Sequence, residues 1–341
     1  MLMFNEPHTH AILAFVATGH VVFFDAATRS PVECIDVGLQ AHAAFPTPDQ
    51  TYVVVANQNG KLLQRISTDY AANAFALDDA ATLDLATCVT PNGFACQDPN
   101  LRPDTAPICP VVDSTSQFTF VTLRGGGMFV VDSTATPMAI VAEYDKETVH
   151  PNGCGGVETA GKMYINSGGG TMPNPLEADL YFFPMTEFSS SPNPPNTPPP
   201  VIVFSHDDRG FVDSHGAALT KHDRFLWVAD RAANRVVVVD TRTDSVVTEI
   251  ELVGSVSDDP APDLMDISPA GNRMFVSLRG PNPLTGNVPG VDNAVGSTPG
   301  VGVLRIERGG AEGVLQAIAP ITHIVGGVEL ADTHALRVRM T

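Results

Sequence analysis

The 341-residue chain has a formal charge of -19, because 38 acidic residues oppose 19 basic ones. An excess of acid on this scale repels phosphate backbones and anionic lipid surfaces, so nucleic acid is not an expected partner. Hydrophobic residues make up 43% and charged residues 17%, which excludes intrinsic disorder. No apolar run reaches the ~18 residues that a membrane span needs, so we expect a folded chain without one.

The elements predicted along the chain are strands. Residues 10–24 are interpreted as two strands joined by Thr18-Gly19, because two His interrupt the run and no basic segment precedes it, as a signal peptide would require. Farther along, short β-branched and aromatic runs alternate with turns rich in Gly, Asn, Asp and Pro, and helical periodicity is nearly absent. The sequence therefore predicts an all-β chain.

One four-stranded unit recurs along the chain. Its clearest copy is residues 213–254, in which tight turns separate four strands. Equivalent second strands are expected at Leu13, Tyr52, Phe118, Lys162, Phe225 and Arg273. Repeats of about 40 residues or more with four strands each are typical of a β-propeller. We predict a single propeller domain over residues 1–341, with six blades, or seven if residues 71–107 contain a degenerate one.

The N-terminal copy shows a second, a third and a fourth strand, but no first strand. Residues 332–340 match the pattern of residues 213–221, with His334 where His215 stands. We expect this C-terminal strand to complete the N-terminal blade and to close the ring, because closure removes the free edges of the sheets.

Three segments, residues 42–57, 213–250 and 266–278, resemble the YVTN-type β-propeller repeat family. The resemblance covers most of the chain and implies the propeller fold. It implies no single function, since similar blades occur in surface-layer proteins, lactonases and the copper-bearing propeller of nitrous oxide reductase. The long insertions and unequal blades of this chain depart from the plain repeat.

The insertions are unevenly distributed between the two faces of the predicted propeller. Connections from first to second strands are short, whereas the opposite face receives the long ones, residues 87–107, 167–178, 206–214, 253–262 and 280–300. Long loops gathered at one face are typical of a pocket wall or lid. Residues 188–200 lie on the short-turn face and are interpreted as a polyproline surface arm.

The residue near the head of each first strand is expected to face the central channel. In blade order these residues are His334, His42, Ile108, Asn152, His215 and Asp263. Imidazole and carboxylate groups that converge in this way suit a transition metal ion such as Zn, Fe, Mn or Cu, which predicts His42, His215, His334 and Asp263 as ligands. As the alternative, each His only hydrogen-bonds neighbouring backbone.

Two arginines end second strands at equivalent places, Arg124 and Arg279. Each offers a planar fork to a carboxylate or phosphate group of a ligand. The alternative is an ion pair with an inter-blade Asp such as Asp104, Asp213 or Asp263.

Two functions follow from these residues. The first is a metal-dependent hydrolase or lyase, or an oxidoreductase if the metal is redox-active, that acts on a small anionic molecule with Asp263, Arg124 and Arg279 as catalytic groups. The second is a non-catalytic propeller that binds a protein or glycan partner through its long-loop rim. The sequence does not decide between enzyme and binding protein, nor does it give the oligomeric state.

The five cysteines lack CxxC spacing. Cys88 and Cys96 bracket a short turn-rich segment, as a loop disulfide would, while Cys109 and Cys154 are interpreted as packed thiols. A disulfide favours a periplasmic or secreted protein whose leader is absent from this sequence, with the cytoplasm as the alternative.

Overall fold

The computed structural model describes residues 1–169, 177–190, 197–206 and 212–340. These residues form five four-stranded sheets, one five-stranded sheet and one two-stranded sheet, and every strand pair whose register is described is antiparallel. The helical elements among them are single 3-10 turns, η1 (Asp79–Ala81), η2 (Met185–Glu187), η3 (Lys221–Asp223) and η4 (Arg308–Gly310). The all-β prediction is confirmed. No helix in this part of the chain is long and apolar enough to cross a bilayer.

The chain divides into two compact units. The first comprises Met1–Gly153, Phe183–Pro200 and the chain end from Arg339, and the second comprises Cys154–Phe182 and Val201–Val338. The expectation of one domain over the whole chain stays a prediction.

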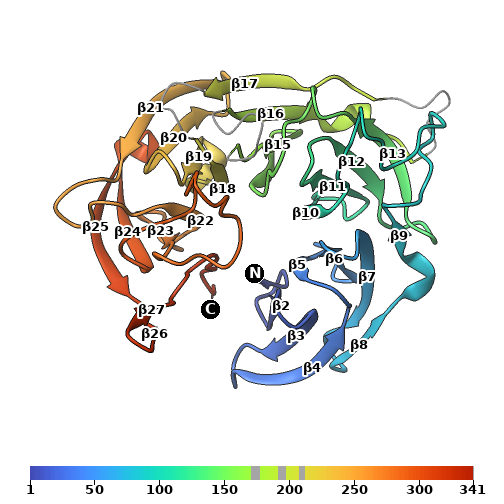
Figure 1. The fold of residues 1–341 in the computed structure, drawn as a ribbon, viewed down its shortest axis with the longest axis horizontal. Helices are drawn as coiled ribbons and strands as arrows, with labels where there is room; N and C mark the ends of the chain where they lie inside the picture. The colour runs from blue at the N-terminus through green and yellow to red at the C-terminus, as the bar shows by residue number, and fades with distance from the viewer. Residues whose placement is uncertain (170–176, 191–196, 207–211, 341) are drawn as a thin grey trace. The chain divides into compact units, whose positions relative to one another are not determined.

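Three sheets belong to the first unit (Figure 1). The first sheet consists of β1 (Leu2–Phe4), β2 (His10–Phe15), β3 (His20–Asp25) and β4 (Ser30–Asp36). The second consists of β5 (Ala41–Pro46), β6 (Tyr52–Asn57), β7 (Leu62–Asp69) and β8 (Ala74–Leu77), and its extra strand β9 (Leu83–Asp84) pairs with β7. The third consists of β10 (Pro107–Val112), β11 (Phe118–Leu123), β12 (Met128–Asp132) and β13 (Ala139–Tyr144).

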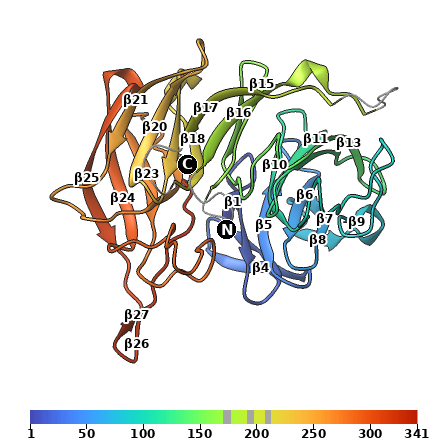
Figure 2. The same ribbon diagram turned by 45° about the horizontal axis from the view of Figure 1, so that its top comes forward.

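Three further sheets belong to the second unit, apart from the end of β16. The first of them consists of β14 (Gly156–Thr159), β15 (Lys162–Asn166), β16 (Ala178–Pro184) and β17 (Val201–His206). The next consists of β18 (Ser214–Leu219), β19 (Phe225–Asp230), β20 (Arg235–Asp240) and β21 (Ser245–Glu251). The last consists of β22 (Pro262–Ile267), β23 (Arg273–Leu278), β24 (Gly300–Glu307) and β25 (Glu312–Pro320). A hairpin of β26 (Ile324–Val325) and β27 (Val328–Glu329) projects from this unit (Figure 2).

The repeat prediction places the strands accurately. Five predicted second strands begin at the residue expected for them, namely Tyr52, Phe118, Lys162, Phe225 and Arg273, while Leu13 lies inside β2. Residues 71–107 contribute β8 and β9 to the second sheet, with η1 between them, and form no separate four-stranded sheet within the described chain.

The core lies between successive sheets within each unit. In the second unit, Trp227 of β19 and Met274 of β23 belong to one cluster of buried side chains, and both are fully buried. In the first unit, Phe23 of β3 and Val55 of β6 belong to another. Since each sheet buries its apolar side chains against a neighbouring sheet, apolar packing joins consecutive repeats.

The prediction that residues 332–340 complete the N-terminal sheet is wrong. Its first strand is β1, which pairs with β2 in the register Leu2↔Leu13, so the N-terminal residues already occupy that position. Residues 332–340 form no strand. The backbone N–H of Val338 donates to the Asp266 carboxylate in the second unit, and Arg339 donates to the carbonyl oxygen of Ala26 in the first.

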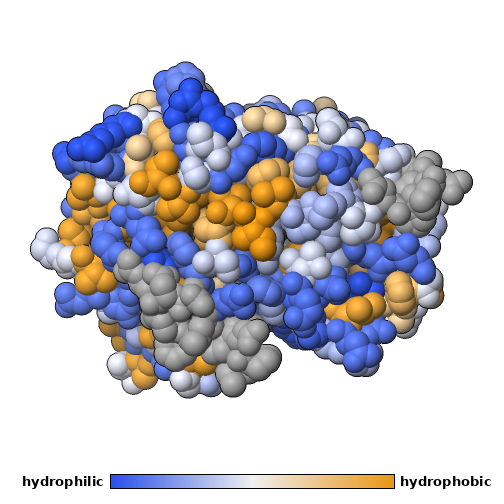
Figure 3. Space-filling model, turned by 90° about the horizontal axis from the view of Figure 1, so that it is seen from above, coloured by the Kyte–Doolittle hydropathy of each residue, from blue (hydrophilic) through white to orange (hydrophobic). Residues whose placement is uncertain are grey.

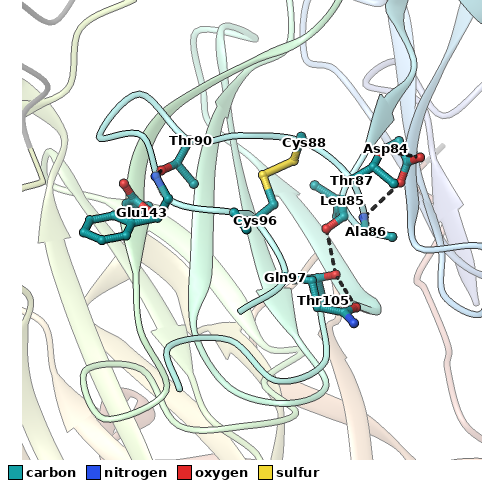
Figure 4. The surroundings of a disulfide bond; sticks show 12 residues. Asp84, Leu85, Ala86, Thr87, Cys88, Thr90, Cys96, Gln97, Thr105 and Glu143 are labelled. Atoms are coloured by element: carbon teal, nitrogen blue, oxygen red, sulfur yellow. Dashed lines mark hydrogen bonds between the residues drawn. A yellow bond between two sulfur atoms is a disulfide. The ribbon is translucent and has the colours of Figure 1, made fainter. Parts of the chain in front are cut away.

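A disulfide joins Cys88 to Cys96 in the excursion between the second and third sheets, as the sequence predicts (Figure 4). The same excursion is held by side-chain hydrogen bonds, among them Thr105 Oγ1 to the carbonyl oxygen of Leu85. Cys109 and Cys154 are also disulfide-bonded, which corrects their interpretation as thiols. Cys34 is a free, exposed cysteine.

Replacing both Cys88 and Cys96 with Ala should lower the free energy of unfolding by roughly 2–3 kcal/mol, because the bond closes a short loop and restricts the unfolded chain. Urea denaturation of the variant and the parent measures the difference. The matched control is Cys34→Ala, which removes an exposed thiol outside any disulfide. A loss of equal size in the control would contradict the assignment of the effect to the crosslink.

Candidate metal centre

The first strands of four sheets share a bulge at one position. His42, Ile108, His215 and Asp263 are each the second residue of their strand, and the strand's register with its neighbour shifts at that point by one residue. A bulge of this kind re-aims a side chain away from its regular direction. His215 and Asp263 therefore stand at a backbone irregularity that four of the repeats have in common.

Two of these bulged strands, β18 and β22, lie very close together in the second unit. Gly216 follows His215, and a Cβ atom at Gly216 would lie 2.2 Å from the carbonyl oxygen of Asp263. Only a residue without a side chain permits this approach of the two backbones. The glycine therefore allows His215 and Asp263 to lie near each other.

The third member of the site comes from the C-terminal segment. The carbonyl oxygen of His334 accepts a hydrogen bond of 3.0 Å from Ser277 Oγ of β23, and Ser277 Oγ also lies 3.0 Å from the carbonyl oxygen of Leu264 in β22. The segment thus runs alongside the last sheet of the second unit. It brings the His334 imidazole to the other two side chains.

His215, Asp263 and His334 form a compact cluster. The Nε2 atoms of the two imidazoles are 3.2 Å apart. Asp263 Oδ1 lies 3.7 Å from Nε2 of His215, and Asp263 Oδ2 lies 3.7 Å from Nε2 of His334. The Asp263 side chain is fully buried and that of His215 is 5% exposed, whereas His334 is 17% exposed and gives the cluster its contact with solvent.

Two buried arginines hold the Asp263 carboxylate. Its Oδ2 accepts hydrogen bonds of 3.2 Å from Arg231 and 2.8 Å from Arg279. Arg231 also donates twice to Asp213 Oδ2, and Arg279 donates to both oxygens of Asp332. The three carboxylates outnumber the two guanidinium groups by one, so these five side chains carry a net charge of -1 when all are ionised.

The charges in this network shift the pKa values of its carboxyl groups in opposite directions. Burial by itself raises the pKa of Asp263, but the charges of His215, His334 and the two arginines hold that pKa well below its usual range. Burial raises the pKa of Asp213 to about 7, against the lowering effect of Arg231. Asp263 is therefore a carboxylate at every pH near neutrality.

The loop between β23 and β24 lies against the same network. Asn293 donates to the Asp213 carboxylate and, at 2.9 Å, to the carbonyl oxygen of Gly286. The backbone N–H of Leu284 donates to Asp332, and Arg279 donates to the carbonyl oxygen of Thr285. The long insertion at 280–300 therefore contacts the site residues. Two other predicted insertions, 167–178 and 206–214, include residues 170–176 and 207–211, which lie outside the described residues. Part of the predicted arm at 188–200 also lies outside them.

The structure does not place every predicted residue in this cluster. His42 belongs to the first unit, where its Nδ1 lies 2.7 Å from the carbonyl oxygen of Ile108, the backbone contact that the alternative reading expects. Arg124 pairs with Asp104 at 2.6 Å and Arg279 pairs with Asp263, so both arginines make the ion pairs of the alternative. Metal binding and catalysis by these residues stay predictions.

Asn152 is not at the position predicted for it. The two sheets can be aligned by their second strands, in which Ile165 is the fourth residue of β15 and Val228 the fourth residue of β19. In the first strands, the residues paired with them are Gly156 and Ala217. His215 precedes Ala217 by two residues, so the equivalent residue in the earlier sheet is Cys154. The prediction erred because the connection into β15 is two residues shorter than its counterparts.

Sequence reasoning missed Arg231 and the partners Asp332 and Asn293. Arg231 stands six positions after the head of its second strand, as Arg124 and Arg279 do, so the repeat spacing contains a signal for it. The match between residues 332–340 and 213–221 places Asp332 where Asp213 stands, so it contains a signal for Asp332 as well. Asn293 has no such signal, because it lies in the insertion at 280–300.

No protein-family model matches the chain, and no curated protein does. Solved structures do match. Hydrazine synthase of Kuenenia stuttgartiensis is 13% identical, over 89% of this chain and 75% of that chain, with a TM-score of 0.58. A chain in the mitotic checkpoint complex is 11% identical, over 94% and 77%, with a TM-score of 0.61. A putative 6-phosphogluconolactonase from Bacteroides fragilis is 9% identical, over 93% and 84%, with a TM-score of 0.59.

Similarity at these identities shows the fold alone. Together with the meander of four-stranded sheets, it confirms that the chain has a β-propeller fold. The resemblance to the YVTN-type repeat family stays a prediction.

Replacing Arg231 with Ala should lower the free energy of unfolding by about 3–5 kcal/mol, since Asp213 loses its buried counter-charge and Asp263 loses one of two. Chemical denaturation of the metal-free protein measures the change. Arg242→Ala is the control, because Arg242 is 70% exposed and lies 4.0 Å from its acidic neighbour. Equal stabilities of the two variants would contradict the role given to Arg231.

Proposed function

We propose that the second unit holds one transition metal ion between His215, His334 and Asp263, and that the protein is an enzyme acting there on a small anionic molecule. The observation that carries the proposal is the convergence of two imidazole Nε2 atoms and one buried carboxylate. The side chains of Asp263 and His215 are more than nine-tenths buried, whereas that of His334 is partly exposed. A ligand would therefore reach the cluster from the side of His334.

The donor set fits a metal ion. Two nitrogen ligands bonded to one ion at about 2.0–2.1 Å lie roughly 2.9–3.4 Å apart, and the observed separation is 3.2 Å. Two imidazoles and one carboxylate suit Zn, Fe, Mn or Cu. Asp263 Oδ1 is buried and, among the residues described, has no hydrogen-bond donor, so an acceptor is present where a cation would bind.

A metal ion in this position would polarise a bound carbonyl or lower the pKa of water, which supports hydrolysis or elimination, or redox chemistry if the ion is iron or copper. His215 and His334 would hold it through Nε2. Asp263 would serve as a ligand and not as a base, because the charges around it hold its pKa well below its usual range and two arginines occupy its Oδ2.

The net charge of the site would attract an anionic substrate only when a metal ion is bound. The five acidic and basic side chains of this network sum to -1 when all are ionised, which repels an anion, and a divalent cation reverses the sign. The structural alternative for the two imidazoles is a hydrogen bond between them, which joins β18 to the C-terminal segment without any metal.

A different observation favours the second candidate, a non-catalytic binding protein. Val201 and Ile202 of β17 and Val246 and Val247 of β21 are exposed on neighbouring outer strands of the second unit. Hydrophobic residues also reach the surface in patches bordered by hydrophilic residues on the face that Figure 3 shows. Exposed apolar patches mark many protein interaction sites. On this reading the partner is a protein, and Ile202→Ser weakens its binding without changing metal content.

The disulfides support an oxidising compartment. We propose that the protein is periplasmic or secreted, because disulfide bonds persist there and are rare in the cytoplasm.

Metal analysis tests the enzyme proposal. Protein purified without chelators and then supplied with Zn, Mn, Fe(II) or Cu should retain close to one equivalent of one of these metals after desalting. His215→Ala and His334→Ala should each reduce that content to background, because two ligands from this set bind far more weakly than three. Inductively coupled plasma mass spectrometry gives the stoichiometry.

His222→Ala is the matched control, since His222 lies in the turn η3 of the same unit and belongs to no metal-ligand cluster found in the described residues. It should keep the full metal content. If the parent protein retains less than a tenth of an equivalent of every metal, the proposal fails and the imidazole pair is structural.

A further inference from the structure

The two oxygens of Asp263 have different surroundings. Oδ2 accepts one N–H from Arg231 and one from Arg279, and it lies 3.7 Å from His334 Nε2. Oδ1 is buried and has no donor among the residues that the structure describes, and it lies 3.7 Å from His215 Nε2. Because a buried carboxylate oxygen without a donor is costly, the asymmetry indicates that Oδ1 has another partner when the site is complete.

The two arginines have no nitrogen left over for a substrate. In Arg231, Nε and Nη2 donate to Asp213 and Nη1 donates to Asp263. In Arg279, Nε and Nη2 donate to Asp332, Nη1 donates to Asp263, and Nη2 also donates to the Thr285 carbonyl oxygen. Both guanidinium groups are almost completely buried. Neither is placed to receive an anion from solvent.

The outer ends of this Asp-Arg-Asp-Arg-Asp chain are fixed by one loop. At one end Asn293 donates to Asp213, and at the other the backbone N–H of Leu284 donates to Asp332. Since both contacts come from the insertion between β23 and β24, the loop holds the arginines against Asp263 from two sides. A carboxylate held in this way has little freedom to rotate.

We infer that Arg231 and Arg279 are positioning residues that occupy Oδ2 of Asp263 and leave Oδ1 as its single metal-binding oxygen, so that a carboxylate or other small anion binds at the metal and not at the arginines. This inference rests on the proposed function. It replaces the expectation that Arg279 recognises the anionic substrate directly, and it assigns the insertion at 280–300 to the support of the metal ligand.

The test uses Co2+ as the metal and acetate as the anion. Full-length protein is titrated with Co2+, followed by visible absorption, and X-ray absorption of the loaded protein counts the carboxylate oxygens at the metal. We expect one such oxygen. Arg231→Lys and Arg279→Lys should each weaken Co2+ binding about 10–100-fold, as loss of a group that orients a metal ligand does. Arg305→Gln, which breaks a surface ion pair with Glu307 in the same unit, should bind Co2+ like the parent.

Acetate distinguishes the two places where an anion can bind. Added to Co2+-loaded protein, it should change the visible spectrum, and added to metal-free protein it should give no binding heat in calorimetry. Binding of acetate to metal-free protein that is lost in Arg279→Lys would overturn the inference, as would two carboxylate oxygens at the metal in the parent. Because the oxygen count is made on the parent, it stands even if a variant fails to fold.

The outcomes also separate this inference from the proposed function. A parent protein that takes up no Co2+ refutes both. A parent that binds one Co2+, together with lysine variants that bind it equally tightly and show the same spectrum, refutes the positioning role alone.

Discussion

The burial of the Asp263 carboxylate is the constraint on which the second unit's site depends. A lone charge in a protein interior is very unfavourable, and this one is compensated by two buried guanidinium groups that themselves need further carboxylates. The result is a chain of alternating charges that ties together the ends of several strands, a long loop and the C-terminal segment. These parts are far apart in sequence, and charge compensation fixes them in one arrangement.

Burying these charged side chains costs free energy that the ion pairs only partly recover, so a functional role would explain why they are present. Replacing a buried ionic network with apolar groups of similar size is often neutral or stabilising, so stability alone is a weak reason for a network of three acidic and two basic side chains in the interior. Orienting the Asp263 carboxylate toward the two imidazoles would be such a role for the network. The bulges at His215 and Asp263 also favour a functional role, because they turn these side chains out of the regular pattern of the sheet.

The propeller fold by itself does not choose between the candidate functions. The similar structures include a synthase, a chain of a checkpoint complex and a putative lactonase, and they resemble this chain only in fold. Function in such folds depends on side chains at a few positions of a common framework. In the function that we propose, those positions are His215 and Asp263, the second residues of β18 and β22, and the arginines that follow β19 and β23.

The sequence by itself determined the all-β class, the repeat and the starts of five second strands, because alternating apolar residues and turn residues act locally. It also placed His215 and Asp263 at equivalent positions, since their repeats have connections of equal length. It failed at Asn152, where a turn is two residues shorter, and at residues 332–340, because Leu2–Phe4 already pairs with β2. The sequence also predicted that His334 joins His215 and Asp263, although through a strand that residues 332–340 do not form. Only the tertiary structure decided that Arg231, Asp332 and Asn293 support Asp263, since those contacts join distant segments through the compensation of buried charge.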